Sequence, residues 1–350
     1  MKRQLLGVAA ILLSISTYAQ DNPLWMRYCA ISPDGTTIAF TYKGDIYTVP
    51  STGGRASQIT TNPAHDTKPI WSPDGKKIAF ASDRMGSMDI FEVNKEGGIP
   101  KRLTTHSGNE TPVAYKDAGH ILFLANIMPT AEDAQFPSGQ FQQVYEVNTE
   151  GGRPILFSSM PMEDISINHT GNTLLYHDKK GYEDPWRKHH TSSITRDIWL
   201  CSLNGNRTFR KQTAFNGEDR TPVWASDDKS FYYLSEEKGS FNIFKRDIDG
   251  NTSKQITNHT KHPVRFLSAA SNGTLCYGYD GEIYTVKEGA IPQKVQISIV
   301  TDKNDKDLIR QIKRSGATEI SLSPDAKEIA FVLRGDVYVT SCLLYTSDAA

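Results

Sequence analysis

The sequence predicts an all-β protein: a six-bladed β-propeller of four-stranded antiparallel blades, followed by the first blade of a second, truncated propeller. Three observations support this prediction. One sequence motif, a turn followed by a strand, recurs along the chain, and a second motif follows each copy. The first serines of two successive copies, Ser32 and Ser72, are 40 residues apart, which gives the length of the repeat. Four short strands per repeat of about 40 residues are typical of a propeller blade. An unrelated β-sandwich is the alternative, but that fold has no reason to repeat one phrase throughout.

Each repeat is predicted to contain four strands, a to d. The first phrase, Ser-Pro-Asp-Gly and a short apolar run, separates strands a and b, and its polar residues suit a type I turn. The apolar run is too short for a helix and rich in β-favouring residues. Clear copies lie at 32–40, 72–80 and 323–331, and weaker ones at 115–123, 168–176, 226–233 and 271–277. Strand c is the second phrase, at 45–49, 89–93, 143–147, 197–201, 242–246, 282–286 and 336–340, and strand d ends in Thr.

The start of the chain reads as a secretory signal at residues 1–19. Lys2 and Arg3 precede an apolar stretch, and Ala19 is a small residue at the cleavage point. The stretch is short for a membrane span, so an uncleaved anchor is the less favoured alternative. We therefore expect an exported, periplasmic protein with no membrane contact after cleavage.

Composition agrees with a soluble all-β domain. The chain is 38% hydrophobic, as expected of a globular domain. Its formal net charge of -1 lacks the excess of basic residues that is typical of nucleic-acid-binding proteins. The four cysteines do not form a disulfide framework. Cys29, Cys201 and Cys276 fall on predicted strands, where each is expected to pack as a small apolar side chain. Cys29 and Cys276 could meet where the ring closes.

Repeats three and four carry long insertions between strands b and c, at 126–142 and 178–196. In a propeller the b–c hairpins and the d–a crossovers lie on one face, and long loops on a rigid scaffold are the usual place for function. Solvated loops without a function are the alternative. The candidate peptide-binding or partner-binding residues on this face are His65, Asp66, His106, Glu110, Trp186, Arg187, His189, His190, Arg220, His259 and His262.

The spacing breaks after the sixth repeat. We expect a first propeller at 20–299, a charged linker at 300–316, the start of a second propeller at 317–341, and a spurious tail at 342–350 that makes the chain a truncated fragment. A single seven-bladed ring with one long connection is the alternative. In a six-bladed ring each blade would use its own four strands, and side-chain packing alone would close the ring. A lone blade cannot bury its faces, so residues 317–350 should pack poorly.

Motifs of known enzyme sites are missing from the sequence. There is no Gly-x-Ser-x-Gly, His-Glu-x-x-His or phosphate-loop motif. The Ser-x-x-Lys match at Ser226 falls on a predicted turn. His177, His189 and His190 lack a carboxylate or cysteine at a recognised metal spacing. We therefore predict no catalytic, cofactor-binding or metal-binding residue in this chain.

The order of these elements resembles the N-terminal propeller region of tricorn-like proteases of Bacteroidetes-type bacteria, in the tail-specific serine peptidase family. The residues that carry the resemblance are 23–28, the insertion at 182–190 and the new blade at 317–325, and it covers essentially residues 2–341. The blade phrases alone are less specific, because TolB-like periplasmic propellers share them.

The resemblance implies a six-bladed propeller, a seven-bladed one, a PDZ-like domain and a serine peptidase core. The propellers would be non-catalytic: they would admit peptides or unfolded polypeptide, filter them and dock the peptidase and PDZ domains. A homo-oligomer is compatible with this arrangement. The family's catalytic residues would lie beyond this chain, so none is assigned here. A free-standing TolB-like propeller that binds a protein partner is the alternative, although it would need neither the charged linker nor the additional blade.

Overall fold

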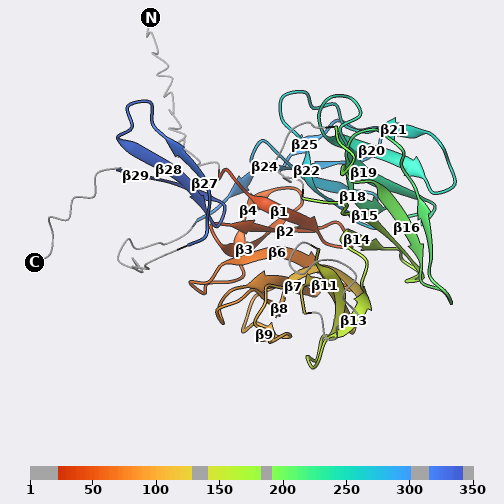
Figure 1. Cartoon of the computed structure of the whole chain (residues 1–350), viewed down its shortest axis with the longest axis horizontal. Helices are drawn as coiled ribbons and strands as arrows, with labels where there is room; N and C mark the ends of the chain where they lie inside the picture. The colour runs from red at the N-terminus through yellow and green to blue at the C-terminus, as the bar shows by residue number, and fades with distance from the viewer. Residues whose placement is uncertain (1–22, 128–140, 183–190, 301–314, 342–350) are drawn as a thin grey trace, which may run out of the picture.

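The computed structural model describes residues 23–127, 141–182, 191–300 and 315–341. Within these ranges the chain forms strands joined by turns (Figure 1). No helix in the described residues is long and apolar enough to cross a membrane. The predicted signal at 1–19 and the tail at 342–350 lie outside the described residues. The predicted all-β propeller of four-stranded antiparallel sheets is confirmed.

Six described sheets have four strands each, paired in chain order as a, b, c and d. The first three consist of β1 (Arg27–Ile31), β2 (Thr37–Tyr42), β3 (Asp45–Pro50) and β5 (Ser57–Gln58); β6 (Asp66–Trp71), β7 (Lys77–Ser82), β8 (Asp89–Asn94) and β9 (Lys101–Arg102); and β10 (Thr111–Asp117), β11 (His120–Ala125), β12 (Gln143–Asn148) and β13 (Ile155–Ser158). The other three consist of β14 (Met162–Ile167), β15 (Thr173–Asp178), β16 (Ile198–Ser202) and β17 (Thr208–Lys211); β18 (Asp219–Trp224), β19 (Ser230–Ser235), β20 (Asn242–Asp247) and β21 (Ser253–Gln255); and β22 (Arg265–Ala269), β23 (Leu275–Tyr279), β24 (Glu282–Val286) and β25 (Gln293–Lys294).

The recurrent phrase forms the turn that was predicted from it. In the second sheet, Gly75 N–H donates to Ser72 O at 2.9 Å, and the Ser72 hydroxyl donates to Asp74 Oδ1 at 2.7 Å. The same hydroxyl oxygen accepts from Lys77 N–H at 2.9 Å and so fixes the start of strand b. Equivalent bonds occur at Ser32 and Ser323. Local side-chain bonds of this kind hold the turn without help from the rest of the fold.

The threonine that ends strand d also has a repeated structural role. Its hydroxyl oxygen accepts a hydrogen bond from the backbone N–H of the first or second residue of strand c, at 2.9 to 3.0 Å. The four threonines that do this are Thr60, Thr104, Thr213 and Thr257. Because each is buried, the bond satisfies an N–H group that the short strand d leaves unpaired.

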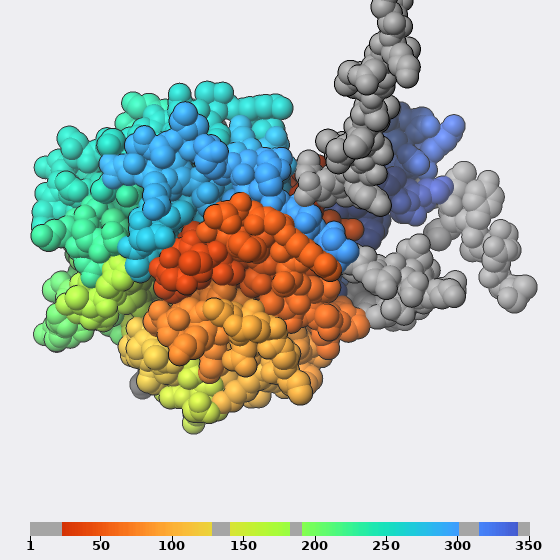
Figure 2. All heavy atoms as spheres, turned by 180° about the vertical axis from the view of Figure 1, so that it is seen from behind, coloured from red at the N-terminus to blue at the C-terminus, as the bar shows by residue number. Residues whose placement is uncertain are grey.

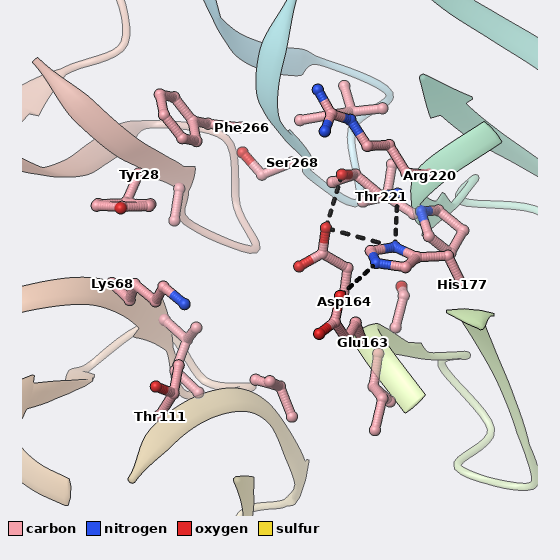
Figure 3. Close-up of a pocket in the computed structure, with 18 of the residues that line it drawn as sticks. Tyr28, Lys68, Thr111, Glu163, Asp164, His177, Arg220, Thr221, Phe266 and Ser268 are labelled. Carbon is pink, nitrogen blue, oxygen red and sulfur yellow. Dashed lines mark hydrogen bonds and ion pairs between the residues drawn. The ribbon is translucent and has the colours of Figure 1, made fainter. Parts of the chain in front are cut away.

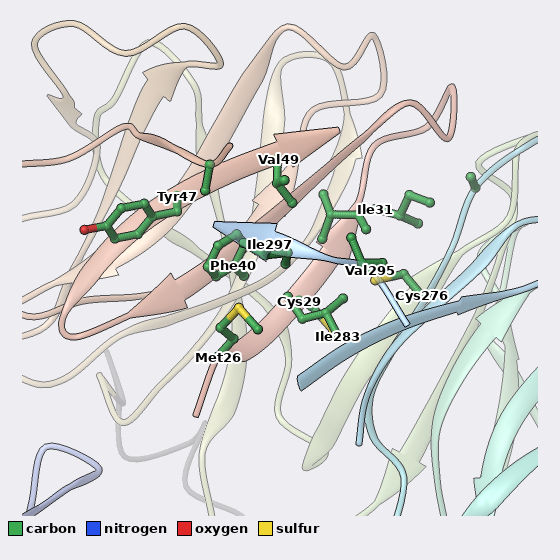
Figure 4. Close-up of a cluster of buried hydrophobic side chains, with 13 residues drawn as sticks. Met26, Cys29, Ile31, Phe40, Tyr47, Val49, Cys276, Ile283, Val295 and Ile297 are labelled. Atoms are coloured by element: carbon green, nitrogen blue, oxygen red, sulfur yellow. The ribbon is translucent and has the colours of Figure 1, made fainter. Parts of the chain in front are cut away.

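Six apolar clusters fill the spaces between neighbouring sheets, including the space between the sixth sheet and the first. Figure 2 shows the first sheet, in red and orange, directly against the last strands of the ring, in light blue. In this seam Phe40 and Tyr47 of the first sheet pack with Cys276 and Ile283 of the sixth (Figure 4). The first sheet therefore makes the contact that a ring of six sheets requires.

The expectation that side-chain packing alone closes the ring is wrong. After the sixth sheet, β26 (Ile297–Ser298) pairs in parallel with β4 (Gly54–Arg55), which leads into strand d of the first sheet. Gly54 N–H donates to Gln296 O at 2.8 Å, and Ala56 N–H donates to Ser298 O at 2.9 Å. A two-residue backbone bridge thus ties the end of the ring to its beginning.

We predict that Gly53→Ala destabilises the ring more than Gly97→Ala. The two glycines occupy equivalent turns, with φ of +93° and +94°. A Cβ at residue 53 would lie 2.7 Å from Gln296 O, whereas one at residue 97 would meet Ile59 O at 3.6 Å. Both variants place an alanine in the left-handed region of φ, which is unfavourable for it. Only Gly53→Ala also displaces the bridge between β4 and β26. Urea unfolding should show about 1 kcal/mol lost for Gly97→Ala and at least twice that for Gly53→Ala. Equal losses would contradict a role for the bridge.

The remaining described sheet stands apart from the ring. It consists of β27 (Ala317–Leu322), β28 (Glu328–Leu333) and β29 (Asp336–Ser341), and it lies at one side of the molecule in Figure 1. Ile320 is 72% exposed and Val337 is 68% exposed. The expectation that one blade alone cannot bury its faces is confirmed for residues 317–341. Arg334, at its hairpin tip, forms an ion pair with Asp83 of the second sheet.

Candidate functional site

A cavity of about 580 Å³ lies at the centre of the ring. It is lined by strand a of all six sheets, β1, β6, β10, β14, β18 and β22. The described ends of both long insertions also border it, through Gln142, Lys179, Tyr182 and Arg196. The described ends of the insertions therefore lie at the rim of the central cavity. Loops on a rigid scaffold are a usual place for a binding site.

A bulge in strand a turns side chains into this cavity. In five of the six strands the register shifts next to a residue with positive φ that is not glycine. These residues are Tyr28, Lys68, Asp164, Thr221 and Phe266. In β10 the equivalent residue is Pro112, whose ring excludes positive φ, and the register shift there falls one residue later. Bulges of this kind re-aim side chains and often lie beside functional sites.

One wall of the cavity is a network centred on Glu163 and His177 (Figure 3). Thr221 N–H donates to His177 Nδ1 at 3.3 Å, so the other ring nitrogen, Nε2, donates to Glu163 at 3.2 Å. Lys179 Nζ donates to the second oxygen of Glu163 at 2.8 Å. Burial alone would raise the pKa of Glu163, but the hydrogen bond from His177 and the charge and hydrogen bond of Lys179 outweigh it and hold that pKa well below its usual range. Glu163 is therefore a fixed, fully paired carboxylate.

Lys68 occupies the facing wall (Figure 3). Its ammonium points into the cavity and lies 5.9 Å from the centre of the Tyr28 ring. The described residues provide it with no hydrogen bond or ion pair within bonding distance. The side chain keeps partial access to the cavity, yet removal from bulk water lowers the pKa of Lys68, an effect that Asp164 and Glu163 partly offset. Among the residues that the structure describes, Lys68 thus contacts an aromatic ring but has no hydrogen-bond or ion-pair partner.

The cavity as a whole carries more positive than negative charge. Its cationic lining residues are Lys68, Lys179, Arg196, Arg220 and Arg265, and its carboxylates are Glu163 and Asp164. The aromatic rings of Tyr28 and Phe266 pack together at 4.9 Å between centroids on the Lys68 side. Among the described residues, no group of three or more His, Cys, Asp and Glu side chains could hold a metal ion. The arrangement suits binding of an extended chain with anionic groups.

Most of the residues predicted from sequence have structural partners instead. Of the described candidates, only Arg220 lines the central cavity, where it also stacks over the Phe241 ring at 4.1 Å. His262 lines a smaller pocket of about 230 Å³ beside Trp25 and forms an ion pair with Asp280 at 3.2 Å. Trp186, Arg187, His189 and His190 lie outside the described residues.

The other candidates are held in place around the ring. Asp66 is buried against Arg84, and Glu110 is buried and bonded to Thr104. His65 is half-buried, and its backbone N–H donates a hydrogen bond to Asp83 Oδ1. Burial and the nearby charge of Arg334 lower the pKa of its imidazole. The remaining two histidines have local partners: His106 Nδ1 accepts from Gly108 N–H at 2.9 Å, and His259 stacks on Tyr279 at 3.9 Å.

The sequence reasoning missed Tyr28, Lys68, Asp164, Thr221 and Phe266. Their common signal is position, since each is the second or third residue of its strand a and lies at the bulge of that strand. That signal is visible only after the strands are aligned by their backbone bonds, because the residue types have nothing in common.

Comparisons with known proteins match the ring of six sheets to one family of β-propeller domains. A profile of the tricorn protease N-terminal beta propeller domain matches residues 23–290. Tricorn protease homolog 1 of Streptomyces coelicolor is 25% identical over 281 residues, which is 79% of this chain and 25% of that protein. The tricorn protease of Thermoplasma acidophilum is 25% identical over 328 residues, which is 90% of this chain and 29% of that protein.

The crystal structure of the tricorn protease shows the same fold. It aligns with a TM-score of 0.68 and 21% identity, over 91% of this chain and 30% of that one. A puromycin hydrolase structure, at 10% identity and a TM-score of 0.51, also has a region of this fold. The chain spans only 24% to 30% of the length of the tricorn proteins it matches.

Proposed function

This chain belongs to the family of tricorn protease N-terminal β-propeller domains, and we propose that it is the non-catalytic, substrate-admitting part of an exported serine peptidase. Its central cavity would receive peptides and filter them, and its outer surfaces would dock the peptidase domains. In this proposal residues 1–19 direct export to the periplasm, 20–299 form the ring, 300–316 link it to a second propeller, and 317–341 begin that propeller. The support is the family match over the ring, together with relatives whose names identify them as proteases.

The observation that carries the proposal is the ammonium of Lys68 in the central cavity. A cation that has lost bulk water and has no direct partner is costly, and it gains most from an anionic ligand. A peptide supplies such a group in its terminal carboxylate or in an acidic side chain. Tyr28 and Phe266 provide an apolar surface beside it for a neighbouring side chain. The opposite carboxylate, Glu163, is already neutralised by its own partners and would not repel the peptide strongly.

We expect Lys68→Gln to weaken binding of a fluorescein-labelled acidic hexapeptide by about tenfold, measured by fluorescence anisotropy on the purified chain. A charge-assisted hydrogen bond contributes roughly 1.5 to 3 kcal/mol, and 1.4 kcal/mol is a factor of ten. The wild-type affinity should fall with added salt, and that of the variant should depend on salt less.

Lys43→Gln is the matched control. Lys43 also lies over a tyrosine ring, Tyr42 at 5.5 Å, but on an exposed hairpin outside the central cavity. Its substitution should leave the affinity unchanged. The proposal fails if the wild-type chain does not bind the peptide, or if both variants lose affinity equally.

A further inference from the structure

Two cysteines from opposite ends of the ring meet at its seam. Cys29 lies on β1 and Cys276 on β23, and both belong to the buried cluster between the first and sixth sheets (Figure 4). The Ser268 hydroxyl lies 3.5 Å from the carbonyl oxygen of Cys29 and 3.4 Å from that of Cys276. One side chain thus reaches both cysteine backbones. Both thiols are free and lie in the same buried cluster, where the Cys29 thiol donates to Phe266 O at 3.5 Å.

The seam they occupy is the one junction of the six-sheet ring that the chain does not connect directly. Besides the bridge between β26 and β4, its backbone bonds run from Met26 N–H to Gly281 O at 3.1 Å and from Ser271 N–H to Pro33 O at 2.9 Å. Every other pair of neighbouring sheets is joined by a short crossover. A covalent link at the seam would convert the open chain into a closed ring. Disulfides that close long loops remove the most freedom from the unfolded chain.

We propose that Cys29 and Cys276 form a disulfide that closes the ring when the protein folds in an oxidising compartment. The two thiols lose two protons and two electrons to an existing disulfide, such as that of oxidised glutathione or of a dithiol oxidoreductase. That disulfide is reduced to two thiols in turn. The proposal rests on the export suggested above, because disulfides persist in exported proteins and are rare in the cytosol.

The burial of both thiols determines when the disulfide forms. Cys29 is 4% exposed and Cys276 is fully buried. Burial raises the pKa of the Cys276 thiol well above its ordinary value, which leaves little of the reactive thiolate in the closed ring. The bond therefore forms as the sixth sheet docks on the first, while an oxidant still has access. Cys201 is also buried, but no second cysteine belongs to its cluster, so it should stay reduced.

The test is refolding of the full chain from guanidinium chloride, with either a glutathione redox pair or a reductant. Cys342 lies outside the described residues, so both arms use a Cys342→Ser background. Oxidising refolding should give a product lighter by two hydrogens, in which peptide mapping links Cys29 to Cys276 and finds Cys201 alkylated. Its melting temperature should exceed that of the reduced product by about 5 °C or more.

Two variants sharpen the result. Cys201→Ser should keep both the link and the rise in melting temperature, and Cys276→Ser should lose both. The comparison of oxidised with reduced protein needs no substitution at the seam, so it stands even if Cys276→Ser folds poorly. The proposal is overturned if both seam thiols are alkylated after oxidising refolding, or if the link involves Cys201. Neither result bears on peptide binding, so the proposed function is tested separately.

Discussion

The Arg84→Met variant should unfold with a free energy about 3 to 5 kcal/mol below that of the wild-type chain. Arg84 Nη2 donates to both oxygens of Asp66, at 2.9 and 3.0 Å, and Asp66 is fully buried. The guanidinium also stacks on the Phe91 ring at 4.6 Å. Methionine keeps most of the apolar stem but leaves a buried carboxylate without its cation. Urea denaturation followed by circular dichroism measures the loss.

The double variant Asp66→Asn with Arg84→Met is the control for this prediction. Removing the carboxylate together with its partner should recover most of the loss, because the damage comes from the unpaired charge. If the single variant loses less than about 1 kcal/mol, the pair behaves like a surface ion pair and the argument fails.

The fold was predictable because its local rules repeat. The Ser72 turn and the Thr60 hydroxyl bond are formed by residues that are close in sequence, so their patterns appear directly in the chain. Each copy adds independent evidence for the same blade. The bridge between β26 and β4 was not predictable in this way. It joins residues more than two hundred positions apart, and a two-residue strand has no periodicity to read.

The site was less predictable because exposure and partners decide what a polar residue does. His259 and Glu110 looked like surface candidates, yet His259 Nε2 is hydrogen-bonded to the Tyr277 hydroxyl and one oxygen of the buried Glu110 accepts from the Thr104 hydroxyl. Lys68 looked like an ordinary lysine between two turns. Its importance comes from a bulge that aims it into the centre and from the lack of an ion-pair or hydrogen-bond partner among the described residues, and neither is encoded by a motif.

The three acidic residues at the start of strand a show how one position acquires different chemistry. Asp66, Glu110 and Asp219 each donate a backbone N–H to the b–c hairpin of the preceding sheet, at 2.7, 2.7 and 3.0 Å. All three side chains are buried. Among the described residues, Asp66 alone of the three forms an ion pair with an arginine. Burial raises the pKa of Glu110 to about 7 and that of Asp219 to about 7, because the charged form loses its hydration.

These shifts predict that stability falls as the pH rises from about 4 to about 7. Below pH 4 Asp219 is protonated in both states, so it contributes nothing to the pH dependence. Between its unfolded pKa, 3.8, and its folded pKa, about 7, only the unfolded chain ionises, which favours unfolding. Above pH 7 both states are ionised and the loss is complete. At 1.36 kcal/mol for each pKa unit, the loss from Asp219 approaches about 4 kcal/mol.

The Asp219→Asn variant should remove this part of the pH dependence. Asparagine cannot ionise, so the stability difference between variant and wild type should shift in favour of the variant by about 3 to 4 kcal/mol between pH 4 and pH 8. Comparing two pH values cancels any cost of the substitution that does not depend on pH, since that cost is the same at both. Urea unfolding at the two pH values measures the shift, and Glu110→Gln should give a smaller shift of the same sign. A difference that stays constant between pH 4 and pH 8 would mean that Asp219 is ionised in the folded ring, with a cation supplied from outside the residues described.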